Sequence, residues 1–320
     1  MTECARAKIG IIMCAYNSEK TIVDSIKSII HQEFSDWHLL IVDDGSNKPL
    51  ARFLMEQGIT DDRITVIRQQ NLGVGISRNN AFDFFRDTPV VYLSILDSDD
   101  MWHPQKLALQ VSVLQSNPET IAVVTTNQFI DNQLTYEDCN FERVDEQAIK
   151  LDLYNDLAGN ILKNGFFFCP ASVLLKSDQA DKFRYHTWRG GEDLAAFLKL
   201  SLDGGPIARM QTPMYWERTL ESSLQRSPET NFRGTYTYID TINILLNEGA
   251  FPAELINQAY QARDKYIQEL FWKGKNMLSL EKFIEILREN FGDIHFPRTK
   301  LLVCFKCLYY LLFLAINRWK

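Results

Sequence analysis

"KIGIIMCAYNSEKTIVDSIKSIIHQEFSDWHLLIVDDGS", residues 8–46, is the stretch that decides the fold. Its first part, 8–16, is a continuous apolar run, typical of a strand buried on both faces of a parallel sheet. Residues 17–32 place their apolar side chains on one helical face. The run 37–46 predicts a second strand, which ends in two acids and a glycine turn. A strand, a helix and a strand in this order predict a parallel pair joined by a crossover helix.

The same alternation continues along the chain. We expect further strands at 63–69, 89–96, 120–127, 166–176 and 204–217, and helices at 48–57, 73–87, 105–116 and 191–202. A polar stretch from 131 to 150 reads as a loop, and helices are expected at 232–248, 252–273 and 279–291. The sequence therefore predicts an α/β fold with a mostly parallel central sheet flanked by helices, followed by a C-terminal helical appendage.

Length and composition narrow the function classes. The chain has 320 residues and a net charge of −7, so we expect no nucleic-acid partner. Six cysteines are scattered, and Cys14 and Cys169 lie in strand-like runs, which indicates reduced thiols in a cytosolic compartment. The first ten residues lack an apolar segment, so no signal peptide is expected.

Three carboxylates crowd the end of the predicted strand 89–96. Asp97, Asp99 and Asp100 lie within four positions, and like charges that close repel unless a cation lies between them. In such sheets ligands bind beyond the carboxyl ends of the strands, where "AYN", "DDGS" and "DSDD" should converge. Carboxylates with phosphate oxygens are the usual magnesium or manganese ligands, which predicts a metal–diphosphate site. The alternative is that one or two acids cap the helix beyond Pro104.

Three segments together resemble glycosyltransferase family 2. They are "IIMCAYNSEKTIVDSIKSIIHQEFSDWHLLIVDDGS" (11–46), "NLGVGISRNNA" (71–81) and "LDSDDMWHPQKL" (96–107). The family consists of inverting, nucleotide-sugar-dependent transferases with the Rossmann-like GT-A fold, and the resemblance covers roughly 8–205. It implies a GT-A catalytic domain at 1–220 and a helical region at 221–320.

The resemblance implies a role for each matching residue. The nucleotide-sugar pocket would be lined by Ala15, Tyr16, Asn17, Glu19, Asp44, Asn71, Arg78, Asp97, Ser98, Asp99 and Asp100. Asp44 looks like the acid that contacts the base, usually uracil, and Asn79 belongs to the same "NxGxxxxRN" segment as Arg78. Asp97 and Asp99 look like the DxD pair that holds Mn2+ or Mg2+, with Asp99 favoured as the direct ligand. As alternatives, Tyr16 only fills a crevice and Arg78 is a surface cation.

A second acidic centre lies in "WRGGEDLAAF", residues 188–197. An inverting sugar transfer needs a base that takes the acceptor hydroxyl proton. In the family an ED motif at a helix start supplies it, so Asp193 looks like the catalytic base. Glu192 and Trp188 are the implied acceptor-binding residues. As alternatives, Asp193 only complements the helix dipole and Trp188 is a core residue.

The sequence departs from the family pattern in one place. Family members often carry Arg-x-His after the last strand, and the His completes the metal shell. Here Arg218 matches the Arg, but Leu220 stands at the His position. Either His186 or Glu221 replaces it, or the cation has only the DxD pair and phosphate. The QxxRW motif of processive synthases is also absent, which favours a single addition.

The stretch 295–320 is apolar and basic, without acids. Its apolar run, 301–316, is shorter than the roughly 20 residues of a spanning helix. It predicts an interfacial helix that binds anionic lipid, hence peripheral contact with the inner face of the plasma membrane. The alternatives are packing on the preceding helices or an oligomer contact.

These features predict a cytoplasmic, metal-dependent, inverting hexosyltransferase. We expect a UDP-hexose or UDP-N-acetylhexosamine donor and a hydroxyl acceptor on lipopolysaccharide, capsule or a lipid-linked saccharide. A non-catalytic nucleotide-sugar-binding module is the alternative, which the missing His favours. A receiver-like phosphoacceptor domain also binds magnesium through paired acids, but it is shorter and requires a lysine after its last strand.

Overall fold

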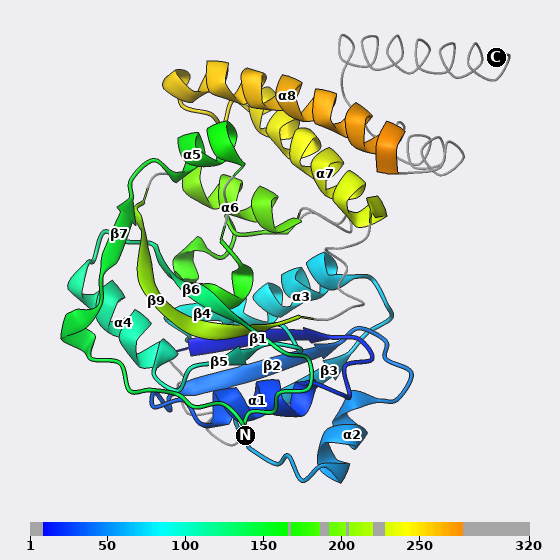
Figure 1. Cartoon of the computed structure of the whole chain (residues 1–320), viewed down its shortest axis with the longest axis vertical. Coiled ribbons are helices and arrows are strands. Elements are labelled where there is room, and N and C mark those ends of the chain that lie inside the picture. Colours follow the sequence, from blue (N-terminus) through cyan, green and yellow to red (C-terminus); the bar gives the residue numbers. More distant parts are fainter. Residues whose placement is uncertain (1–8, 166–167, 186–191, 203–204, 220–227, 278–320) are drawn as a thin grey trace, which may run out of the picture. The chain divides into compact units, whose positions relative to one another are not determined.

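The computed structural model describes residues 9–165, 168–185, 192–202, 205–219 and 228–277 (Figure 1). The polypeptide divides into two compact units, Met1–Glu269 and Leu270–Lys320, and the sheet lies in the first. The predicted helix 279–291 and the basic stretch 295–320 lie outside the described residues. In the described ranges, no helix is both long enough and apolar enough to span a bilayer.

The described strands form one nine-stranded sheet in the order β3-β2-β1-β4-β8-β6-β9-β5, with β7 also paired to β9. The strands are β1 (Ile9–Ala15), β2 (Trp37–Asp43), β3 (Ile64–Arg68), β4 (Tyr92–Ile95), β5 (Met101–Trp102), β6 (Ala122–Ile130), β7 (Leu151–Tyr154), β8 (Leu174–Lys176) and β9 (Ile207–Arg218). The helices are α1 (Ile22–Ile30), α2 (Leu50–Glu56), α3 (Val74–Arg86), α4 (Lys106–Ser116), α5 (Leu157–Asn164), α6 (Glu192–Leu202), α7 (Pro228–Asn247) and α8 (Ala253–Met277).

The predicted α/β fold is confirmed, and the parallel arrangement holds for the first half of the sheet. Strands β3, β2, β1 and β4 pair in parallel. Strand β8 then pairs antiparallel with both β4 and β6, and β6 pairs in parallel with β9. Two reversals cancel, so β6 and β9 run in the same direction as β1. The carboxyl ends of β1, β2, β4, β6 and β9 therefore meet at one edge of the sheet.

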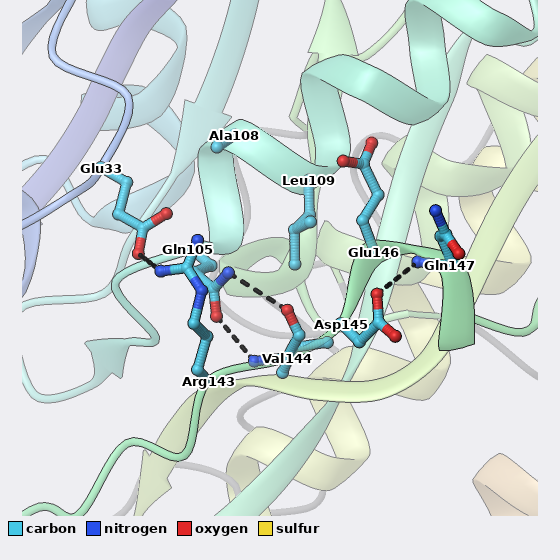
Figure 2. A pocket seen from close by; sticks show the side chains of 9 residues that line it. All are labelled: Glu33, Gln105, Ala108, Leu109, Arg143, Val144, Asp145, Glu146 and Gln147. Atoms are coloured by element: carbon cyan, nitrogen blue, oxygen red, sulfur yellow. Dashed lines mark hydrogen bonds and ion pairs between the residues drawn. The ribbon is translucent and has the colours of Figure 1, made fainter.

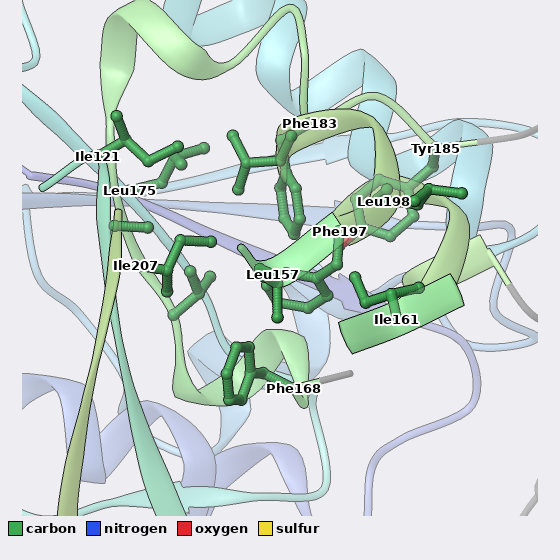
Figure 3. Close-up of a cluster of buried hydrophobic side chains, with 14 of the residues drawn as sticks. Ile121, Leu157, Ile161, Phe168, Leu175, Phe183, Tyr185, Phe197, Leu198 and Ile207 are labelled. Carbon is green, nitrogen blue, oxygen red and sulfur yellow. The ribbon is translucent and has the colours of Figure 1, made fainter. Parts of the chain in front are cut away.

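Each face of the sheet has its own buried core, because alternate side chains of a strand point to opposite faces. Ile11 and Met13 of β1 lie in a cluster with residues of α1, α2 and α4. Ile12 lies in the other cluster, with residues of α3, α5 and α6. Figure 3 shows the second cluster around Phe197, whose ring lies 4.9 Å from that of Phe183. Helix α7, beyond the expected domain end at residue 220, contributes to the same cluster.

The structure differs from the predicted elements mainly between residues 140 and 180. Of the expected strand 166–176, the structure describes residues 168–176, and within these the strand is confined to Leu174–Lys176, because a 3-10 helix occupies Pro170–Ser172. Proline has no N–H to donate to a sheet, which explains the interruption. Strands β5 and β7 and helix α5 were not predicted. Asp156 caps α5 through the N–H of Gly159, at 2.8 Å.

The two cysteines in strand-like runs lie within the core. Burial raises the pKa of Cys14 to about 12 and that of Cys169 well above the ordinary thiol value. Both are free thiols. Because the reactive form of a cysteine is the thiolate, these side chains act as small apolar groups in the packing.

Candidate active site

The loops after β1 and β2 are tied together at the carboxyl edge of the sheet. The N–H of Asp44 donates to the Ala15 carbonyl at 2.8 Å. Asn17 has a positive φ of 50°, its N–H donates to Ser46 Oγ at 3.0 Å, and its Oδ1 accepts from the Asn47 N–H at 2.8 Å. Asparagine tolerates this left-handed conformation better than most residues. Asn17 therefore links the loops after β1 and β2, and its predicted place in the nucleotide pocket stays a prediction.

Two further residues of this first loop were predicted to line the pocket. The Tyr16 side chain is 53% exposed, so it does not fill a crevice of the folded chain. Glu19 lies three residues on and is half-buried. The Thr21 hydroxyl, which the sequence analysis missed, donates to the Ser98 carbonyl at 2.8 Å. This bond joins the loop after β1 to the DxD turn.

Asp44 is held by protein donors at the start of α3. Its carboxylate accepts from the N–H groups of Leu72 and Gly73, both at 2.9 Å, and from Gln69 Nε2 at 2.8 Å. Gly45 beside it has a φ of 81°, and a Cβ there would lie 2.9 Å from the Asn71 nitrogen. Asn71 itself is exposed on this loop. Asp44 thus orders the 69–73 loop, and its predicted contact with a base stays a prediction.

Arg78 joins the two predicted acidic centres. Its Nη2 donates to Asp97 Oδ1 and its Nη1 to Asp193 Oδ1, both at 2.7 Å. The Arg78 side chain is 4% exposed, whereas the two carboxylates are about one-third exposed, at 31% and 30%. Burial alone would lower the pKa of Arg78, but the neighbouring acids hold that pKa well above its ordinary value. Arg78 is therefore a buried cation of the site, not a surface residue.

Asn79, the next residue, fixes the segment that leads to Asp193. Its Nδ2 donates to the Tyr185 carbonyl and its Oδ1 accepts from the Tyr185 N–H, both at 2.9 Å. The Tyr185 ring lies under the Arg78 guanidinium, 4.9 Å from its Cζ. Both ends of the Asn79 amide are therefore used within the protein. We infer that this residue positions the chain rather than contacting a nucleotide.

Burial and mutual repulsion affect the DxD acids. Burial and the charge of Asp97 raise the pKa of Asp99 to about 6. Burial, and then the charges of Asp99 and Asp97, raise the pKa of Asp100 well above its ordinary value. Arg218 lies beside both: its N–H donates to Asp100 Oδ1 and its Nε to the Asp99 carbonyl, each at 2.9 Å. Asp100 is buried and orients the turn, while Asp97 and Asp99 are each partly exposed.

These acids fit a divalent cation that shares its shell with phosphate. Among the residues that the structure describes, no three His, Cys, Asp or Glu side chains form a metal-binding group. Magnesium and manganese are commonly held by one or two carboxylates and substrate phosphates, and Asp97 with Asp99 provides that donor set. Burial and the charge of Asp97 raise the pKa of Asp99, and the charge of Arg218 acts in the opposite direction.

Several predicted residues fall in undescribed segments. Trp188, His186, Leu220 and Glu221 lie outside the described residues, so neither the acceptor platform nor the substitute metal ligands can be placed. Glu192 is the first residue of α6, and Asp193 follows it. The prediction that the ED motif opens a helix is therefore confirmed. The role of Glu192 stays a prediction.

A surface hollow of about 380 Å³ lies between α4 and residues 143–147 (Figure 2). Neither the DxD acids nor Asp193 line it. The Gln105 amide makes both hydrogen bonds to the Val144 backbone, and Arg143 pairs with Glu33 at 3.0 Å. These contacts hold the 131–150 loop on α4. Several polar groups of this hollow are thus engaged in contacts within the protein.

Comparison with known proteins assigns the chain. The family model described as glycosyl transferase family 2 matches residues 10–175, more than half of the sequence. The chain belongs to glycosyltransferase family 2. It is a transferase by that membership, and the matched segment contains every residue of the predicted nucleotide-sugar pocket.

Individual members of the family share only modest sequence identity with this chain. An uncharacterized glycosyltransferase of Nostoc sp. is 27% identical over 302 residues, 87% of this chain and 88% of the relative. The Escherichia coli glucosyltransferase WfgD is 34% identical over 110 residues, 34% of this chain and 42% of the relative. The chain thus spans most of the first relative and less than half of the second.

Solved structures support the GT-A fold. Staphylococcus aureus TarS, solved in complex with UDP, superposes with a TM-score of 0.61 at 16% identity, covering 86% of this chain and 76% of TarS. The Pyrobaculum calidifontis mannosyltransferase PcManGT, solved with GDP-Man and Mn2+, gives 0.58 at 15% identity, covering 95% and 80%. At this identity the likeness to both enzymes concerns the fold alone.

Proposed function

We propose that this family 2 member is a metal-dependent, inverting glycosyltransferase that moves one sugar from a UDP-sugar to a hydroxyl of a surface-glycan acceptor. The observation that carries the proposal is the Arg78 bridge, which places the DxD carboxylate Asp97 and the base candidate Asp193 on one guanidinium. The two acids are 96 positions apart in the sequence, 193 minus 97, and their shared buried cation supports a single site that contains both.

On the donor side, the loops after β1 and β4 would hold the nucleotide and its diphosphate. The exposed Tyr16 ring is available to lie against a base. A Mg2+ or Mn2+ ion held by Asp97 and Asp99 would supply charge neutralisation of the leaving diphosphate. The E. coli relative is named for a UDP-Glc donor and TarS was solved with UDP, and both facts support a UDP-hexose or UDP-N-acetylhexosamine here.

On the acceptor side, Asp193 is the proton acceptor. Its carboxylate is partly exposed and ion-paired to Arg78, which stabilises the charged form that a base requires. The acceptor hydroxyl transfers its proton to this carboxylate while its oxygen attacks the anomeric carbon, opposite the departing diphosphate. Attack from the opposite side inverts the configuration at that carbon.

The acceptor class is proposed from the relatives. WfgD is named for a diphosphoundecaprenol-linked acceptor, and Bacillus subtilis TuaG for teichuronic acid biosynthesis. Both names support a lipid-linked or cell-surface saccharide as the acceptor, which would place the enzyme at the inner face of the plasma membrane. The second candidate, a non-catalytic nucleotide-sugar-binding module, rests on the leucine at the family's His position, residue 220.

Donor hydrolysis across a panel of nucleotide sugars tests the proposal. We expect wild-type protein to bind and slowly hydrolyse one UDP-sugar in Mn2+ or Mg2+, and to lose both activities in EDTA. Binding without hydrolysis or transfer would favour the binding module. If no nucleotide sugar binds with either metal, the transferase proposal is wrong.

Arg78→Lys tests the bridge itself. Lysine keeps the charge but lacks the planar fork that reaches two carboxylates at once, so we expect kcat/KM for transfer to fall about 100-fold. Steady-state kinetics with the UDP-sugar found above measures the loss. Arg86→Lys, which changes an exposed arginine on the same helix, is the matched control and should leave kcat/KM unchanged. Equal activity of both variants would remove the bridge from the mechanism.

A further inference from the structure

A row of side chains crosses the carboxyl edge of the sheet beside the DxD turn. Strand β9 lies between β5 and β6, with Trp102 opposite Tyr215 and Phe129 opposite Glu217. Continuing the β5 ladder by one pair beyond Met101 and Trp216 brings Asp100 beside Glu217. Paired residues share a face of the sheet, so Asp100, Glu217 and Phe129 form one row. Neighbouring strands lie about 5 Å apart, which places Phe129 about 10 Å from Asp100.

Glu217, in the middle of the row, is held in place by neutral groups. Asn127 Nδ2 donates to its Oε2 at 2.7 Å, and the Tyr215 hydroxyl donates to the same atom at 3.4 Å. Burial raises the pKa of Glu217, and the charge of Asp97 raises it further. Both of these hydrogen bonds fall on Oε2. A half-buried carboxylate anchored in this way suits hydrogen bonding to hydroxyl groups.

Phe129, at the end of the row, is 68% exposed. The next residue on the same strand, Ile130, is 7% exposed, so the exposure of Phe129 is not caused by fraying of β6. Its ring and the Glu217 carboxylate lie on one face, with the aromatic surface at one end and a hydroxyl acceptor beside it. Sugar sites combine these two chemistries, because one face of a pyranose is apolar C–H surface and its edge is hydroxyls.

We propose that Phe129 and Glu217 form a subsite for the acceptor saccharide, with the Phe129 ring stacked on the sugar's apolar face and Glu217 accepting from a ring hydroxyl. This inference rests on the proposed function, since it names where the acceptor of that reaction binds. The row begins at the DxD turn, so an acceptor bound on Phe129 lies within reach of a donor held by Asp97 and Asp99.

Saturation-transfer NMR on the full chain tests the subsite directly. The probes are the methyl β-glycosides of glucose, galactose and N-acetylglucosamine, with UDP and Mg2+ in the same sample. With wild-type protein, we expect saturation to be transferred to the axial protons on one face of the sugar in at least one glycoside. In Phe129→Ala, the affinity for that glycoside should fall about tenfold, which corresponds to the loss of one good aromatic contact. The UDP signals should stay unchanged.

Three further variants keep the result interpretable. Phe129→Tyr preserves the ring and should bind the glycoside as wild type does. Tyr260→Ala removes an exposed aromatic from α8, far along the chain, and should change nothing. Glu217→Gln keeps one acceptor oxygen. It should lower the affinity for the glycoside without changing the affinity for UDP.

The outcomes separate this inference from the function it rests on. UDP signals without any glycoside signals from wild type, or glycoside signals equal in wild type and Phe129→Ala, would overturn the subsite alone. Loss of Mg2+-dependent UDP binding in Glu217→Gln, with glycoside signals intact, would assign Glu217 to the cation instead and also overturn it. Absence of UDP signals from wild type would overturn the proposed function and the subsite together.

Discussion

Asp193→Asn is expected to reduce sugar transfer by about 1,000-fold while UDP binding in Mg2+ stays within about threefold of wild type. The amide keeps the shape of the carboxylate, and its oxygen can still accept from Arg78 Nη1, which lies 2.7 Å from Asp193 Oδ1 in the wild-type protein. What it loses is the ability to take a proton. Transfer kinetics and calorimetric titration with UDP measure the two quantities separately.

Asp181→Asn is the matched control for this prediction. Asp181 is also ion-paired to arginine, but its side chain is 75% exposed and it lies away from the acids of the sheet edge. We expect unchanged transfer in this variant. If Asp193→Asn retains more than about one-tenth of wild-type transfer, another group is the base, since general base catalysis contributes at least 100-fold in most enzymes.

Asp99→Asn is expected to remove metal-dependent donor binding. The variant loses a negative charge at the place where a cation would join Asp99 to the diphosphate, so we expect UDP affinity in Mn2+ to fall about 100-fold. In EDTA the wild type and the variant should bind UDP equally weakly. Titration of UDP at fixed Mn2+, and again in EDTA, measures the metal-dependent part of the affinity.

Asp100→Asn provides the sharper comparison, because the two residues are adjacent but differently placed. Asp100 is 5% exposed, and its Oδ1 accepts from the Arg218 N–H, a bond that asparagine can keep. Its raised pKa indicates that burial disfavours its charge. We therefore expect a smaller loss of UDP affinity than in Asp99→Asn. A larger loss would assign the metal to Asp100 and contradict the arrangement proposed here.

Most of the first half of the fold could be predicted from local pattern. Strands β1, β2 and β3 and helices α3 and α4 begin and end within a few residues of the predicted positions. The apolar runs of these strands are continuous because both faces of the sheet are covered. They alternate with helices whose apolar side chains lie on one face, and the two patterns are easy to tell apart. The antiparallel half was harder to predict. Strand β8 has three residues and β5 has two, too few for any period to show.

In the candidate site too, some residues were identified from the sequence, whereas one central contact is seen only in the structure. The crowding of Asp97 and Asp99 after a strand predicted a cation site, and the resemblance of residues 188–197 to the family's ED motif identified Asp193 as the base candidate. Nothing in the sequence indicated that Arg78 bridges two of them. A long-range pair of this kind depends on how α3 and α6 pack on the sheet, and it leaves no local spacing to read.

Glu217 and Phe129 illustrate the same limit. Each stands in an apparently ordinary strand, and only the double reversal at β8 brings the ends of β6 and β9 to the edge that carries the DxD turn. The sequence by itself determined the family, the donor-side motifs and the identity of the base candidate, since these are carried by contiguous residues. The tertiary structure decided which side chains share the site, because strand order and register depend on packing between segments far apart in the chain.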